Sequence, residues 1–158
     1  MTKADLLALA LDDFLAISSE VEAAAVVSAD GLAMASALPP NVEEDRLAAM
    51  SAALLTLGER AASELGKGEL AQVFIEGPRG HVILMAAGPD SVLVAVTARG
   101  AKVGLVLFEM RRIAERVAAI MTAGVSDALD TPAGIAVVGE QEAPARDEPS
   151  IASVPSWH

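Results

Sequence analysis

Two short Gly-Pro segments in the middle of the chain constrain its fold more than any other feature. Residues 77–80 (Gly-Pro-Arg-Gly) and 88–91 (Gly-Pro-Asp-Ser) each have the length and the residues of a hairpin turn. They separate three short runs rich in apolar residues, 69–76, 81–87 and 92–97. Strands joined by such turns run antiparallel, so this region is predicted to form a three-stranded meander.

A second hairpin is predicted upstream of the meander. Residues 23–28 and 32–36 are runs of small and apolar residues, and Asp30 and Gly31 lie between them. This pair predicts a two-residue type I′ turn, in which both turn residues have positive φ. The chain is therefore expected to contain five strands.

Three amphipathic helices are expected around these strands, over residues 4–18, 42–65 and 101–122. The first has Leu7, Leu11, Phe14 and Ile17 at helical spacing. The predicted fold is α/β in the broad sense (α+β), with the order α-β-β-α-β-β-β-α. Because strand residues 82–85 are apolar on both alternating faces, we expect one five-stranded antiparallel sheet with helices on both faces.

The domain organisation follows from a change in composition near residue 122. Residues 1–122 are expected to form one domain, and residues 123–158 an acidic, proline-containing tail that is mostly disordered. Two alternatives remain open for the tail: a short strand over residues 135–138, or a short docking segment with apolar residues Ile151, Val154 and Trp157.

Charge and composition narrow the classes of function. The formal net charge of −11 argues against nucleic acid and against anionic membrane surfaces, and no stretch is apolar enough for membrane insertion. The chain has no cysteine and only two histidines, His81 and His158. We therefore expect no catalytic residues, no metal site and no cofactor, and a cytoplasmic protein that binds other proteins.

The second helix carries the candidate binding surface. Its predicted core-facing stripe is Leu47, Met50, Leu54, Leu57, Ala61 and Leu65. The opposite face carries few charges and is predicted to contact a partner protein. The alternative is that its alanines only reflect high helix propensity. The candidate residues are Ala48, Ala49, Ala52, Leu55, Thr56, Glu59, Arg60 and Ser63.

The chain resembles the Roadblock light-chain family, including bacterial MglB-like proteins, over about residues 4–122. The resemblance lies in the element order, in the first hairpin (23–28, then 30–32), in the meander residues 82–85 and in Gly104 near the start of the last helix. It implies a Roadblock/profilin-like sandwich and a homodimer formed through the second helix and the third strand. It also implies that the paired second helices bind a small Ras-like GTPase or another assembly component, as a regulator or scaffold in signalling, without supplying a catalytic residue.

Two other classes of function remain as alternatives. A small-molecule sensing domain would place an apolar pocket between a helix and the sheet, although the scarcity of aromatic residues counts against it. An enzyme with a carboxylate metal site would need Asp and Glu residues that the expected fold does not bring together.

Overall fold

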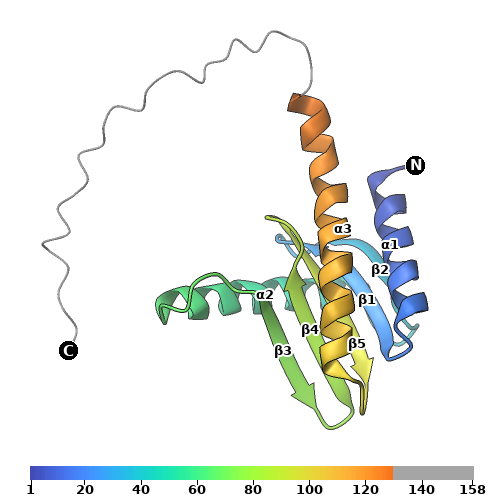
Figure 1. The fold of residues 1–158 in the computed structure, drawn as a ribbon, viewed down its shortest axis with the longest axis vertical. Helices are drawn as coiled ribbons and strands as arrows, with labels where there is room; N and C mark the ends of the chain where they lie inside the picture. Colours follow the sequence, from blue (N-terminus) through green and yellow to red (C-terminus); the bar gives the residue numbers. More distant parts are fainter. Residues whose placement is uncertain (130–158) are drawn as a thin grey trace, which may run out of the picture.

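The computed structural model describes residues 1–129, with side chains described through Ala123. Its centre is a five-stranded antiparallel sheet with the strand order β2-β1-β5-β4-β3 (Figure 1). The strands are β1 (Val21–Ser28), β2 (Ala33–Ala37), β3 (Gln72–Gly77), β4 (Gly80–Ala86) and β5 (Ser91–Ala98). The helices are α1 (Lys3–Ile17), α2 (Glu44–Glu64) and α3 (Val103–Leu129). The predicted order of elements is confirmed.

Helices α1 and α3 cover one face of the sheet. Leu7, Leu11 and Phe14 of α1 are fully buried there against apolar residues of α3 and of the strands. The period of three to four residues explains why these side chains share one face. Ile17, which was expected on the same stripe, is 61% exposed and lies at the end of the helix.

Helix α2 covers the opposite face, behind the sheet in Figure 1. Its core cluster, the α2 cluster, contains Leu47 and Leu55 together with Val27, Leu84 and Val94 of three strands. Neighbouring strand residues alternate between the two clusters, as Ile83 does with Leu84. The predicted sheet with helices on both faces is confirmed.

The turn between β1 and β2 differs from the prediction. Gly31 has a φ of 87°, but no non-glycine residue among the described residues has a positive φ, so the turn is not type I′. Instead, Ser28 donates its backbone N–H to the Leu32 carbonyl, and the Gly31 N–H is donated to the Ser28 carbonyl. This is a three-residue loop with glycine in the left-handed position, which avoids strain at Asp30.

Helix α3 continues past its predicted end at residue 122, as far as Leu129. The sequence 123–129 contains no proline, and Gly124 alone does not end a helix that is otherwise favourable. The predictions for the remainder of the tail concern residues outside those described. Among the described residues, no helix is long and apolar enough to cross a membrane.

Candidate protein-interaction surface

The structure buries a different face of α2 from the one expected. Of the candidate contact residues, Ala48, Ala52 and Leu55 lie in the core and are 1%, 9% and 7% exposed. Their predicted exposure was wrong. The other five candidates lie on the surface and remain available to a partner: Ala49, Thr56, Glu59, Arg60 and Ser63.

Most residues of the predicted core stripe are also exposed instead of buried. Leu47 is buried and Leu54 is half-buried, but Met50 and Leu57 are 51% and 61% exposed. Ala61 and Leu65 are exposed as well. The observed and predicted core directions differ by roughly 100° around the helix axis, about one residue step.

Small residues explain this orientation, because they let α2 lie close to the sheet. A Cβ atom at Gly31, in the β1–β2 turn, would lie 3.5 Å from the Ala49 Cα and 3.7 Å from the Ala52 Cβ. Further along the helix, a Cβ at Gly58 would lie 2.9 Å from Leu70 Cδ2. Bulkier side chains at these contacts would push the helix away, so small residues such as Ala48 and Ala52 are buried there while Met50 faces outward.

Gly58 is the signal that sequence reasoning missed. Glycine inside a helix costs about 0.5–1 kcal/mol relative to alanine, so it calls for a structural reason. Gly58 lies on the same side of α2 as Leu47, Ser51 and Leu55. Treating it as a close-approach position would have identified the buried face.

The outward face of α2 carries an apolar row that we call the α2 stripe: Met50, Ala53, Leu57 and Ala61. All four side chains are exposed, and their spacing of three and four residues places them along one line of the helix. Two ion pairs flank the row, Arg46–Glu43 and Arg60–Glu64, each at 3.4 Å. These pairs are strongly exposed and contribute little to stability, so they leave the stripe open to a partner.

Strand β3 adds a second exposed feature, because it lies at the edge of the sheet. Phe74 is 40% exposed and Ile75 is 38% exposed. Ile75 pairs with Val82, which packs in the α2 cluster, so the Ile75 side chain lies on the α2 face. An edge strand with exposed apolar side chains can accept another strand through its unpaired backbone groups.

His81, the one histidine in the described residues, is held by structural contacts. Its Nδ1 lies 3.1 Å from Thr97 Oγ1, and its ring stacks on Phe74 with centroids 5.1 Å apart. Its Nε2 lies 3.9 Å from the exposed Glu76 carboxylate. No set of three or more metal-ligating side chains occurs among residues the structure describes.

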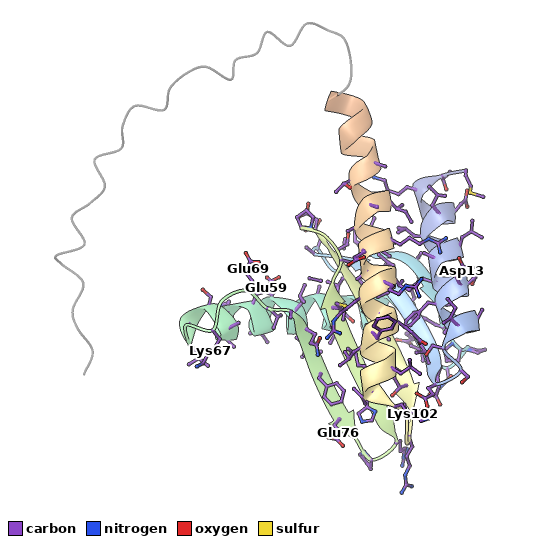
Figure 2. All side chains as sticks on the ribbon, in the orientation of Figure 1. Asp13, Glu59, Lys67, Glu69, Glu76 and Lys102 are labelled. Carbon is purple, nitrogen blue, oxygen red and sulfur yellow. The ribbon has the colours of Figure 1, made fainter. Side chains whose placement is uncertain are left out.

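A hollow of about 710 Å³ lies at the C-terminal end of α2 and is lined by candidate residues Glu59 and Ser63. Glu69 also lines it, and Figure 2 shows Glu59 and Glu69 gathered at this end of the helix. The helix ends at Glu64, and Gly66, the predicted stop signal, follows the cap residue Leu65 with a φ of +68°. Ala86 of β4 and Gly88 also line this hollow, so it lies between the C-terminal part of α2 and the end of β4. Its lining includes the carboxylates of Glu59 and Glu69, unlike the apolar small-molecule pocket considered from the sequence.

Comparison with known proteins identifies the family of this fold. The sequence model of the Roadblock/LC7 domain family matches residues 7–97 of this chain. The chain belongs to the Roadblock/LC7 family. The resemblance stated from the sequence is therefore confirmed.

The chain is also similar to an archaeal protein and to a Roadblock/LC7 domain of known structure. An uncharacterised protein of Methanocaldococcus jannaschii is 37% identical over 100 residues, covering 63% of this chain and 87% of that protein. A Roadblock/LC7 domain from Streptomyces avermitilis superposes with a TM-score of 0.55 and 31% identity, covering 70% of this chain and 96% of the other.

Two further solved structures share the fold. A structure described as MglB with tetrameric arrangement has a TM-score of 0.70 at 22% identity and covers 76% of this chain and 90% of its own. A Schizosaccharomyces pombe profilin has a TM-score of 0.53 at 17% identity, with 75% and 97% covered. The expected Roadblock/profilin-like sandwich is thus confirmed at the level of the fold.

Proposed function

We propose that this Roadblock/LC7 chain is a non-catalytic, cytoplasmic homodimeric scaffold that binds a small Ras-like GTPase and regulates its cycle. The observation that carries the proposal is the joint exposure of the α2 stripe and the free edge of β3. Both features belong to the surface through which the family resemblance implies dimerisation.

The area of a stable interface supports the use of both elements. Specific protein–protein interfaces bury about 800 Å² on each partner, more than four helix side chains provide. Pairing β3 with β3 of a second copy would extend the sheet across the dimer and satisfy the backbone groups at its edge. The α2 stripes of the two copies would then pack side by side, with Met50 and Leu57 as the largest contacts.

The remaining exposed candidates lie beside the stripe. Ala49, Thr56 and Arg60 follow one another along the neighbouring line of α2. In the proposed dimer, these residues of both copies would form a surface with small central side chains, which is suited to a partner backbone. We propose this surface, extended by Glu59 and Ser63, as the GTPase contact.

Solution mass tests the dimer. We expect twice the chain mass at micromolar concentration, and a shift toward the monomer in Leu57→Glu because the variant buries a charge in the interface. Leu32→Glu is the matched control, since Leu32 is similarly exposed, at 67%, but lies in the β1–β2 turn. A monomeric wild-type chain would disprove the dimer.

Binding to a Ras-like GTPase encoded in the same genome tests the second half of the proposal. We expect the wild-type chain to bind the GTPase loaded with either GDP or a non-hydrolysable GTP analogue, with different affinities. Thr56→Arg should weaken binding while the mass remains that of a dimer. Equal binding by this variant would reject the proposed contact surface.

A further inference from the structure

A groove between α1 and α3 lies outside the proposed dimer surface. It has a volume of about 280 Å³, and Phe14, Ile17 and Ile113 supply its apolar walls. Figure 2 shows Asp13, another of its lining residues, on the side of α1. A groove of this size can take one large side chain.

The rim of the groove is also apolar. Leu105 and Phe108, one turn before the groove residues of α3, are 51% and 55% exposed. Contacts from Lys3 to Met121 and from Lys102 to Glu20 show that α1 and α3 run antiparallel. The exposed Ile17 therefore lies level with the first turns of α3, and the three side chains form an uncovered apolar border.

The polar groups in the groove specify what can bind there. One carboxylate oxygen of Glu109, Oε2, is buried without a hydrogen-bond partner among the described residues. Arg116 is already paired with Asp13 at 2.6 Å, whereas Arg112 forms no ion pair within the described part of the chain. A fitting occupant is therefore apolar, donates one hydrogen bond and stacks on a guanidinium group.

An indole ring meets all three requirements. Its body is apolar, its Nε1–H is only a donor, and its face is the best aromatic partner for a cation. Rotation about the last torsion of Glu109 exchanges the two carboxylate oxygens, so a donor inside the groove can reach an acceptor. The chain has a single tryptophan, Trp157.

We propose that residues 151–158 of the same chain bind this groove, with the Trp157 indole inserted between α1 and α3 and its N–H donated to Glu109. Ile151 and Val154 precede Trp157 at intervals of three residues and would cover the apolar rim. The segment would thereby bury surface that the described residues leave exposed.

The chain between α3 and the segment is long enough for this contact. From Leu129 back to the level of Glu109, α3 spans about 30 Å. The residues from Leu129 to Trp157 span up to about 90 Å when extended. Binding within one chain therefore needs no unfolding of α3.

Tryptophan fluorescence of the full chain tests the proposal, because the chain has one Trp and no Tyr. We expect blue-shifted emission and weak quenching by acrylamide in the wild-type chain. Ile17→Glu and Arg112→Glu, both at exposed positions, should shift the emission to the red and increase quenching several-fold. Leu32→Glu is the control and should change neither signal.

Three results would overturn the proposal. The first is wild-type emission already typical of an indole in water. The second is emission that changes in Leu57→Glu but not in Ile17→Glu, which would place the segment on the α2 stripe. The third is loss of the blue shift on dilution, which would show that a second copy provides the groove.

Discussion

Gly58 of α2 lies so close to Val73 of β3 that a Cβ atom at Gly58 would come within 3.0 Å of Val73 Cγ2. The contact fixes where α2 crosses the edge of the sheet, and with it which side chains of the helix face outward. The glycine in the interior of α2 thus allows this close approach, although alanine would form the helix more readily.

Substitution of Gly58 by leucine should therefore destabilise the fold. Overpacking against Leu70 and Val73 is expected to lower the free energy of unfolding by about 1–3 kcal/mol, as measured by chemical denaturation. Gly104→Leu in α3 is the matched control, because nothing lies within 4 Å of a Cβ at Gly104. Equal effects at the two positions would contradict a close-packing role for Gly58.

The elements that the sequence predicted well are those with one apolar face. Leu7, Leu11 and Phe14 of α1 are buried, as expected from their spacing. Hairpin turns rich in Gly and Pro likewise located the strands. In each case a single local pattern was compatible with one orientation only.

The candidate site was less predictable because α2 has apolar residues on two faces. The helical period placed Met50 and Leu57 on a core-facing stripe, but tertiary packing buries Ala48 and Ala52 instead. The distance between α2 and the sheet, which decides between these faces, depends on the β1–β2 turn and on β3. The periodicity of the helix itself does not encode this distance.

The corrected orientation changes the expected effect of mutations in α2. Leu55→Glu places a charge in the α2 cluster, where Leu55 is 7% exposed, and should unfold the domain or reduce its stability by several kcal/mol. Ala49→Glu, on the exposed side, should leave the unfolding midpoint nearly unchanged. Thermal denaturation, followed by circular dichroism, distinguishes these two variants. A Leu55→Glu variant as stable as the wild type would contradict the burial of Leu55 against the sheet.

Asp5 gives α1 a dependence on pH. Its carboxylate accepts the Thr2 backbone N–H at 2.9 Å, and the Thr2 hydroxyl accepts the Asp5 N–H at 3.1 Å. Hydrogen bonding of Thr2 to this carboxylate, first from its backbone N–H and then from its side chain, lowers the pKa of Asp5 below its ordinary value of 3.8. The folded state therefore gains stability above that value and loses it as the pH falls through the lowered pKa.

The measurement compares wild type with Asp5→Asn by amide exchange in the first turns of α1. The protection difference between them should be largest near neutral pH and should shrink as the pH falls below about 3.8. Asp12→Asn, on the exposed side of the same helix, is the control. A difference that stays constant with pH would show that the capping box contributes no pH dependence.

The edge of β3 offers a test of dimerisation that is independent of α2. Lysine on an edge strand hinders pairing with another strand, because its charge would have to be buried. Ile75→Lys is therefore expected to weaken self-association at least tenfold, equivalent to about 1.4 kcal/mol, as measured by sedimentation equilibrium. Ser36→Lys is the control: Ser36 pairs with Ala25 of the α2 cluster and so lies on the same face, but on β2 at the opposite edge. If the dimers of both variants dissociate equally while the chains remain folded, the second copy does not bind through β3. If only the Ile75→Lys dimer dissociates, the β3 edge and the α2 stripe belong to one interface.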